Sequence, residues 1–270
     1  MRGSSRAAFI AGHDALTAAL GTGADWSALA EDLFGISGAL DSSASLRRAL
    51  ADPSREASAK RELVGRLFGG KVGDAALSVL SELVAQRWSE ERDLTDALEL
   101  LAVETVTASA EAGGRLDALE DELFRFARVV AGTAELRDAV ADRNASRGAQ
   151  ADLVGRLLQG KASAESVRLA RQAVLAPRGR RFDRTIELYL QVAAKRREQL
   201  TATATSAVAL DDAQRRRLAE ALTGLYSRPV QVNVVVDPAV IGGIRVQIGD
   251  EVVDGTMLRR LEAARRLLAG

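Results

Sequence analysis

The stretch "LRRALADPSREASAKRELVGRLFGGK" (residues 46–71) returns later in the chain as "LRDAVADRNASRGAQADLVGRLLQGK" (residues 136–161). Aligning residues 33–71 with 123–161, at a constant offset of 90 and without a gap, gives 16 identities in 39 positions. Chance would give roughly four, since a biased composition inflates random matches. The sequence therefore predicts that one structural unit has been duplicated.

Apolar residues around the repeat follow helical spacing in both copies. Steps of three and four residues separate them, so each copy presents one apolar helix face. The matching residues are Trp26, Leu29, Leu33, Ile36 and Leu40, and then Leu116, Leu119, Leu123, Phe126 and Val130. The pattern predicts helices near 5–20, 25–41, 44–51, 56–69, 73–88, 91–111, 115–131, 134–142, 147–159, 163–176 and 180–200.

The pattern changes at about residue 202. Segments rich in Thr and Val, beginning with "TATATSAV", lie between turn residues and predict short strands. A helix is expected between the first two of them, from Asp211 or Asp212 to about Leu225, and a last helix near 257–269. The expected fold is mainly α with a small α/β C-terminal module. It has two tandem helical bundles related by duplication (1–111 and 91–200), which share the helix near 91–111, followed by the module at 201–270.

The repeated segments "GRLFGGK" and "GRLLQGK" fit the pattern G-x-x-x-x-G-K of a phosphate-binding loop. Such a loop needs a preceding strand and a Ser or Thr after the Lys, but Val72 and Ala162 follow here, and the upstream residues are helical. We expect Gly70 and Gly160 to end helices, and the glycines one turn earlier, Gly65 and Gly155, to mark close helix contacts.

Other chemistry has little support in the composition. The chain contains no Cys and a single His, His13, on a polar helix face without an identifiable partner, so no catalytic residue, metal or cofactor is expected. Basic residues gather in 168–217 and acidic ones in 89–142. We interpret the basic side as solvated or docking an acidic protein rather than nucleic acid, because aromatic residues are scarce there. No apolar run is long enough for a membrane span, and we expect a cytoplasmic chain.

The segment "RPVQVNVVVDPAVIGGIRVQIGDEVVDG" (residues 228–255), following a helical bundle, resembles the delta subunit of the bacterial F-type ATP synthase, related to the mitochondrial oligomycin-sensitivity-conferring protein. The resemblance runs from about Leu116 to the C-terminus. The extra bundle in front resembles the long actinobacterial form of the subunit. The residues that match the family's motif are Asp237, Ile241, Gly242, Gly243, Val246, Gly249, Asp254 and Gly255.

This resemblance implies a non-catalytic stator in the peripheral stalk of the proton-translocating ATP synthase. In the family, the helical bundle holds an N-terminal helix of an alpha subunit, and the C-terminal module binds the end of the b subunit. One copy per complex is expected, peripheral on the cytoplasmic side of the cell membrane and without direct membrane insertion.

If the family's groove carries over, it lies between the first and fifth helices of a bundle. In the second copy these helices contribute Leu98, Leu101, Val106, Val167, Ala170 and Val174. In the first copy they contribute Phe9, Ile10, Leu16, Leu77, Leu80 and Val84. All of these residues are also candidates for the core.

Two other functions stay open from the sequence. One is a cytoplasmic helical-repeat adaptor, which would have no need of the C-terminal module. The other is a nucleotide-dependent enzyme that uses the G-x-x-x-x-G-K segments, and ATP-dependent thermal stabilisation would distinguish it.

Overall fold

The computed structural model describes residues 3–21, 23–142, 144–198, 200–226, 229–238, 240, 242–248 and 251–254. The chain divides into two compact units, a helical unit (Met1–Arg196) and an α/β unit (Arg197–Gly270). Each has its own apolar core among the described residues. The final helix expected near 257–269 lies outside the described residues.

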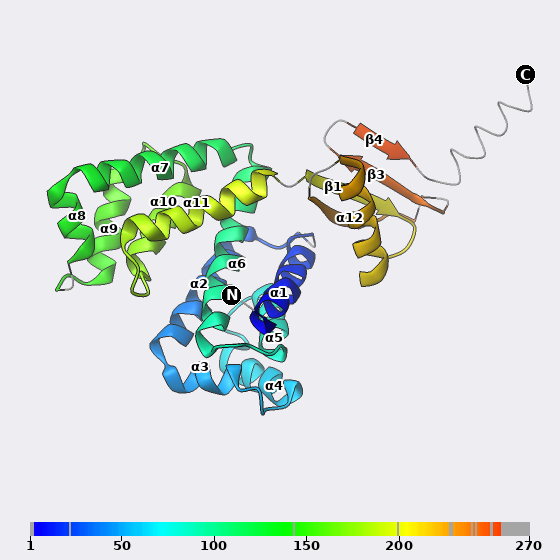
Figure 1. Cartoon of the computed structure of the whole chain (residues 1–270), viewed down its shortest axis with the longest axis horizontal. Helices are drawn as coiled ribbons and strands as arrows, with labels where there is room; N and C mark the ends of the chain where they lie inside the picture. Colours follow the sequence, from blue (N-terminus) through cyan, green and yellow to red (C-terminus); the bar gives the residue numbers. More distant parts are fainter. Residues whose placement is uncertain are drawn as a thin grey trace, which may run out of the picture. The chain divides into compact units, whose positions relative to one another are not determined.

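The helical unit consists of eleven described helices (Figure 1). The first six are α1 (Ser4–Gly21), α2 (Trp26–Ser42), α3 (Ala44–Ala51), α4 (Ala57–Phe68), α5 (Asp74–Ala85) and α6 (Glu91–Ala112). The next five are α7 (Leu116–Gly132), α8 (Ala134–Ala141), α9 (Arg147–Leu158), α10 (Ala164–Leu175) and α11 (Phe182–Glu198).

Helices α2 to α5 and α7 to α10 have the same lengths and the same spacing along the chain. Their bounds differ by the offset of 90 on which the two sequence copies align. This agreement fits the predicted duplication, which itself stays a prediction. The helix predicted over 73–88 ends earlier, at Ala85, and Trp88 lies in the connection that follows.

Helix α6 lies at the centre of the helical unit and packs against α1, α2, α3 and α5 on one side and against α7 and α10 on the other. Leu94, Leu98 and Leu101 have no exposed surface. One apolar cluster runs from Ala8 in α1 to Ala193 in α11, through α6. The prediction that one helix near 91–111 is shared by both bundles is therefore confirmed, whereas the boundaries of two separate domains within 1–200 stay a prediction.

The α/β unit has a described sheet of four strands in the order β2-β1-β3-β4. The strands are β1 (Leu200–Ser206), β2 (Val230–Val236), β3 (Ile244–Ile248) and β4 (Glu251–Asp254), and α12 (Asp212–Tyr226) connects β1 to β2. Strands β1 and β2 are parallel, and the other two pairs are antiparallel. Alternate residues Ala202, Ala204, Val230 and Val232 are buried together with Leu222 of α12, so the helix covers one face of the sheet.

Candidate interaction surfaces

The residues predicted to line a groove in the second bundle are mostly buried, and the groove itself stays a prediction. Leu98, Leu101 and Ala170 have no exposed surface, and Val106 and Val174 are 5% and 1% exposed. Of the six predicted residues, only Val167 is half-buried, on the hollowed outer side of α9 and α10.

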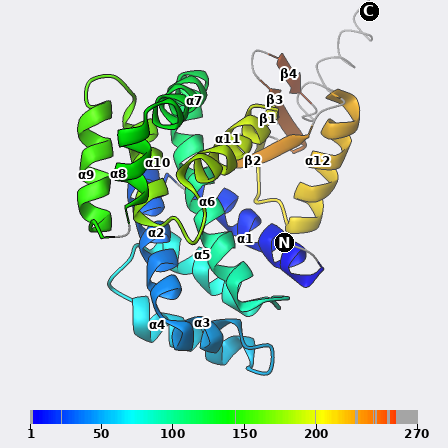
Figure 2. The same cartoon turned by 60° about the vertical axis from the view of Figure 1, so that its left-hand side comes forward.

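Two neighbouring helices of the first bundle contribute to this burial. A Cβ atom built on Gly12 of α1 would lie 3.2 Å from Cδ1 of Leu101, so Leu101 faces the first bundle. Helix α2 packs along α6 and also reaches α10, because the guanidinium of Arg168 lies 4.3 Å from the ring centroid of Phe34 and pairs with Glu31. In the second copy, the first and fifth helices are therefore partly covered by the chain itself (Figure 2).

The corresponding face of the first bundle, made by α1 and α5, retains apolar surface. Leu16, Leu80 and Val84 are buried in the contact between the two helices. Phe9 and Leu77 are half-buried there. Ile10 is 53% exposed but lies two residues from both Ala8 and Gly12, and therefore on the side of α1 that faces away from α5.

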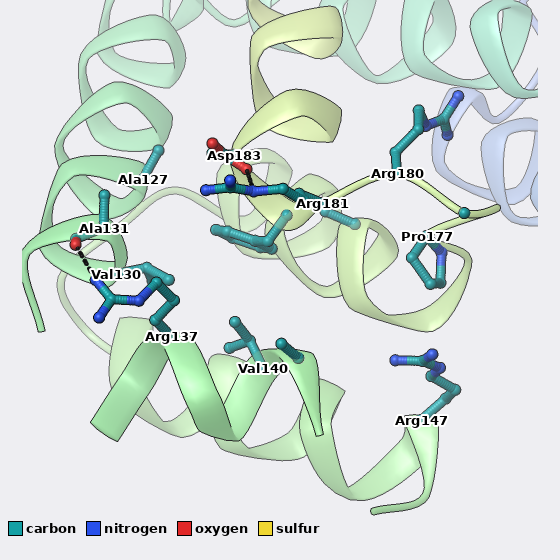
Figure 3. A pocket seen from close by; sticks show the side chains of 14 residues that line it. Ala127, Val130, Ala131, Arg137, Val140, Arg147, Pro177, Arg180, Arg181 and Asp183 are labelled. Atoms are coloured by element: carbon teal, nitrogen blue, oxygen red, sulfur yellow. Dashed lines mark hydrogen bonds and ion pairs between the residues drawn. The ribbon is translucent and has the colours of Figure 1, made fainter. Parts of the chain in front are cut away.

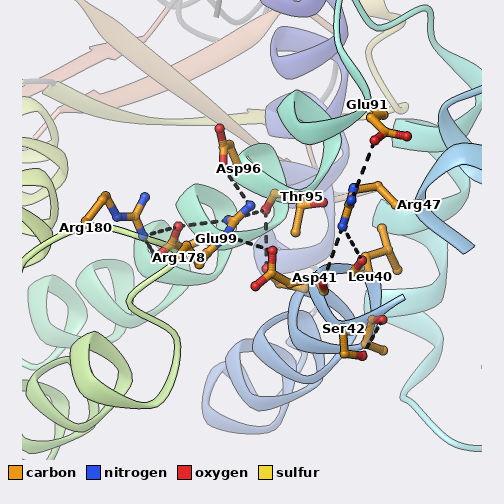
Figure 4. Close-up of polar contacts among 12 residues, drawn as sticks. Leu40, Asp41, Ser42, Arg47, Glu91, Thr95, Asp96, Glu99, Arg178 and Arg180 are labelled. Carbon is orange, nitrogen blue, oxygen red and sulfur yellow. Dashed lines mark hydrogen bonds and ion pairs between the residues drawn. The ribbon is translucent and has the colours of Figure 1, made fainter. Parts of the chain in front are cut away.

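A buried carboxylate, Glu99 of α6, ties the connection between α10 and α11 to the shared helix (Figure 4). Its oxygens lie 3.0 Å from Nη1 of Arg178 and 2.5 and 2.7 Å from Nη2 of Arg180. The hydroxyl of Tyr189 on α11 donates to the same carboxylate at 2.9 Å. Since Glu99 is only 1% exposed, these three donors replace the water that it loses on burial.

Arg178 joins this cluster to α2 as well as to α6. Its guanidinium lies 2.7 Å from Asp96 and 3.7 Å from Asp41, and it donates to the carbonyl of Thr95 at 3.1 Å. The backbone of Arg178 has φ = 51°, a left-handed conformation that costs a non-glycine residue about 1–3 kcal/mol. The strained backbone at Arg178 places its side chain among three carboxylates, and the ion pairs that it forms there offset the strain.

Burial shifts the pKa of two groups in the cluster. Burial, followed by the charge of Glu99, raises the pKa of Tyr189 well above its usual value, so the phenol keeps the proton that it donates. Burial also raises the pKa of Asp96, although Arg178 acts in the opposite direction. The arrangement fixes helices in place and supplies no nucleophile.

The interpretation of the basic segment as solvated or docking an acidic partner is wrong for three of its arginines. Arg178 and Arg180 pair with Glu99, and Nε of Arg196 lies 2.7 Å from Glu111. These three arginines of the basic segment thus pair with acidic residues of 89–142 inside the helical unit. The reason is that α6 lies beside α11 and the connection that precedes it.

The two G-x-x-x-x-G-K segments end helices, as predicted. Gly70 and Gly160 follow α4 and α9 with φ of 70° and 68°, and the N–H groups of Lys71 and Lys161 donate to carbonyls three residues earlier. The predicted close contact at Gly65 is wrong, because nothing lies within 4 Å of a Cβ built there.

His13 does have a carboxylate partner, contrary to the interpretation of its sequence context. Its Nε2 lies 3.6 Å from Oε2 of Glu104 on α6, and the imidazole is only 29% exposed. Burial raises the pKa of Glu104, and the charge of His13 lowers it. The partner was hidden from sequence reasoning because it lies on another helix, far along the chain.

A cavity of about 840 Å³ opens in the second bundle between α7, α8, α10 and the start of α11 (Figure 3). Its floor is apolar and contains Val130, Val140 and Ala173, all buried. Arg137 and Arg147 extend toward it from α8 and α9. No pattern in the sequence pointed to this cavity.

The family-motif residues that the structure describes form the turns and pairings of the sheet. The N–H of Asp237 donates to the carbonyl of Ser206 at 2.9 Å, and Gly242 and Gly243 have φ of 66° and 83°, which favours glycine. Val246, 5% exposed, is opposite Ala204 and Val253, and Asp254 is opposite Arg245. Ile241, Gly249 and Gly255 lie outside the described residues.

Within the described part of the chain, no group of three or more His, Cys, Asp or Glu side chains could hold a metal ion. None of the helices in that part has the length and apolar character required to cross a bilayer.

Sequence patterns did not predict the buried ion pairs of Glu99 or the packing of Trp88 outside a helix. Glu99 lies in "ALELLAVE", directly after Leu98 on a strongly apolar helix, and an acid among buried positions signals a paired charge. Trp88 was assigned to a helix and not considered as a packing residue outside it.

The chain matches the family model of the ATP synthase delta (OSCP) subunit over residues 102–268. The matched region begins within α6 and leaves the first five helices outside it.

Whole-length relatives include the first bundle. The chain is 51% identical to the ATP synthase subunit delta of Kineococcus radiotolerans over 269 residues, which cover 99% of this chain and 98% of that protein. It is 45% identical to the subunit of the same name from Streptomyces avermitilis over 268 residues, covering 99% and 98%. The corresponding protein of Thermobifida fusca is 42% identical over 247 residues, covering 92% of both chains.

Proposed function

The chain belongs to the ATP synthase delta (OSCP) subunit family, and from that premise we propose that it links an alpha subunit of the catalytic head to the b subunit stalk. The delta subunit is a non-catalytic component of the peripheral stalk of the F-type ATP synthase, a membrane-bound complex. Here it would act as a stator on the cytoplasmic side of the membrane, in one copy per complex. The observation that carries the proposal is identity over the whole chain, both units included.

The partner surfaces are assigned by what each unit leaves exposed. An amphipathic N-terminal helix of the alpha subunit needs an apolar face on which to lie. The α1 and α5 face of the first bundle offers the half-buried Phe9 and Leu77, whereas α2 reaches over α10 in the second bundle. We therefore place the alpha contact on the first copy and not on Leu98, Leu101, Val106, Val167, Ala170 and Val174.

The b subunit contact is assigned to the α/β unit. Val235 and Val236, at the end of the outer strand β2, are 49% and 50% exposed. Their side chains point to opposite faces of the sheet, so each leaves apolar surface for a stalk helix on one face. The alternative function, a helical-repeat adaptor outside ATP synthesis, does not account for whole-length similarity to delta subunits.

Two measurements on the full chain test this function. Purification of the tagged chain from membranes at low salt should recover the alpha and b subunits, and recovery without them would contradict the stator. Calorimetry should detect binding of an N-terminal alpha peptide to the wild type and its loss in Leu77→Glu. Val167→Glu is the matched control, since Val167 on α10 lies 90 positions after Leu77 and is also half-buried. Loss in the control, and not in Leu77→Glu, would move the contact to the second bundle.

A further inference from the structure

The cavity in the second bundle has a floor made of small side chains. Each of three floor residues has a counterpart 90 positions earlier that is larger and fully buried. The pairs are Leu40 and Val130, Leu50 and Val140, and Leu83 and Ala173. Each replacement removes at least one carbon atom from a place that the first bundle fills.

A tryptophan completes the packing of the first bundle at this place. Trp88 follows the end of α5 by three residues, is 6% exposed, and lines a much smaller hollow together with Ala51. Its counterpart three residues after α10 is Arg178, whose side chain turns to Glu99 and Asp96 instead. Phe182 of α11 also lines the cavity and packs edge-to-face against Phe126, but the position of the tryptophan itself is taken by Arg178.

The carbonyl that accepts a hydrogen bond from Trp88 has a counterpart in the second bundle that lacks this donor. Nε1 of Trp88 donates to the carbonyl of Leu83 at 2.9 Å. The corresponding carbonyl belongs to Ala173, and the residue four positions later, Pro177, has no N–H to donate to it. The carbonyl of Ala173, at the wall of the cavity, thus lacks its usual helical donor.

The rim of the cavity carries positive charge. Arg180 pairs with Glu99, and Arg181 pairs with Asp183. Arg137 and Arg147, by contrast, donate to the carbonyl of Ala131 and the amide oxygen of Gln150, and neither forms an ion pair with a described carboxylate. Two exposed guanidiniums therefore remain for carboxylates of a partner.

We propose that this cavity receives one tryptophan side chain from an acidic helical segment of a partner protein. The indole occupies the space between Val130, Val140 and Ala173, its N–H donates to the carbonyl of Ala173, and acidic residues beside it pair with Arg137 and Arg147. The surface is separate from the α1 and α5 face, and the inference does not depend on the stator function.

The test uses the full chain and synthetic helical peptides of about 15 residues, long enough for partial helix formation. The probe peptide has glutamates around a central tryptophan. One comparison peptide has alanine in place of the tryptophan, and another has lysines in place of the glutamates. Binding to the wild type and to Ala173→Leu is measured by calorimetry. The fluorescence of the peptide's tryptophan is compared between the same two proteins. The wild type should bind the probe at least about tenfold more tightly than either comparison peptide.

Variants of the chain identify the site. Ala173→Leu restores the leucine of the first bundle, fills the floor and should weaken binding at least about tenfold. Val140→Leu, which adds one carbon, is the second filling variant if Ala173→Leu lowers the melting temperature. Replacement of Arg137 and Arg147 by Gln should weaken binding at least about fivefold and reduce its salt dependence. The matched control replaces Arg66 and Arg125, two exposed arginines of other helices, by Gln and should leave binding unchanged.

Three results would overturn the proposal. One is that the alanine or the lysine peptide binds the wild type as tightly as the probe does. A second is that both filling variants bind the probe as tightly as the wild type does. The third is binding of indole alone as tightly as the probe, which would indicate a small-molecule pocket rather than a protein partner.

Discussion

The hydroxyl of Tyr189 donates to Oε1 of Glu99 at 2.9 Å, and neither residue has more than 1% of its surface exposed. The two residues belong to α11 and α6, so the bond joins the last helix of the helical unit to the helix that both bundles share. A hydrogen bond to a buried charge is stronger than one between neutral groups. We therefore expect the stability of the helical unit to depend on this contact.

Replacing Tyr189 with Phe should lower the free energy of unfolding of the helical unit. The ring still fills its place, but Glu99 loses one donor, which costs about 1.5–3 kcal/mol for a bond to a charged group. Urea unfolding followed by circular dichroism measures the change. Tyr226→Phe, in the α/β unit, is the control and should not alter the transition of the helical unit. An unchanged midpoint in Tyr189→Phe would show that the bond contributes nothing.

Replacing Gly12 with Ala should destabilise the packing of α1 on α5 and α6. A Cβ there would lie 2.2 Å from Cδ2 of Leu83, so the leucine must move, at a cost of about 1–3 kcal/mol. Gly35→Ala in α2 is the matched control. Nothing lies within 4 Å of its Cβ, and alanine should raise stability by up to about 1 kcal/mol through helix propensity. Thermal unfolding should show a lower melting temperature for Gly12→Ala and a higher one for Gly35→Ala. Changes of the same sign in both variants would contradict the packing argument.

Replacing Gly70 with Ala should destabilise the chain by about 1 kcal/mol, since its φ of 70° strains any residue with a Cβ. Gly65→Ala, one turn earlier in α4, meets no neighbouring atom and should instead stabilise the helix.

Magnesium ATP should leave the melting temperature of the wild-type chain unchanged, because both G-x-x-x-x-G-K segments end helices and present no cradle of N–H groups. Stabilisation by ATP that disappears on replacing Lys71 and Lys161 by Ala would restore the phosphate-loop hypothesis.

The ion pair between Glu165 and Arg115 predicts a pH dependence. The hydrogen bond from Arg115, at 2.5 Å, lowers the pKa of Glu165 below its ordinary value. A carboxyl group with a lowered pKa in the folded state stabilises the fold above its unfolded pKa, and this contribution is lost as pH falls through the folded pKa.

The difference in urea midpoint between wild type and Glu165→Gln should therefore be largest near about pH 7 and shrink below about pH 4. Glu187→Gln, at a carboxylate that is 53% exposed beside Arg184, is the control for the loss of an exposed ion pair. A difference that is constant with pH would mean that Glu165 acts through packing and not through its charge.

Much of the local structure follows from the sequence alone. Helical spacing of apolar residues placed α2 to α11 within a few residues, and the repeated glycine after α4 and α9 marked both helix ends. Alternating Val and Thr predicted the strands of the α/β unit, whose motif residues Gly242 and Gly243 adopt the left-handed backbone that only glycine accepts easily. These features depend on neighbours within about one or two turns of chain, so a single sequence carries them.

The functional surfaces depended on contacts that no local pattern encodes. The partial covering of α6 and α10 by α2, which moves the proposed alpha contact from Leu98 and its neighbours to the first bundle, rests on a stacking of Arg168 on Phe34. Glu99 finds its partners 79 to 90 residues away. Beside the cavity, Arg178 turns to those carboxylates, whereas the corresponding Trp88 of the first bundle is buried. The sequence determined which residues form helices and strands, since that choice is local. Only the tertiary structure decided which faces stay open, because burial depends on segments that are distant along the chain and meet in the fold.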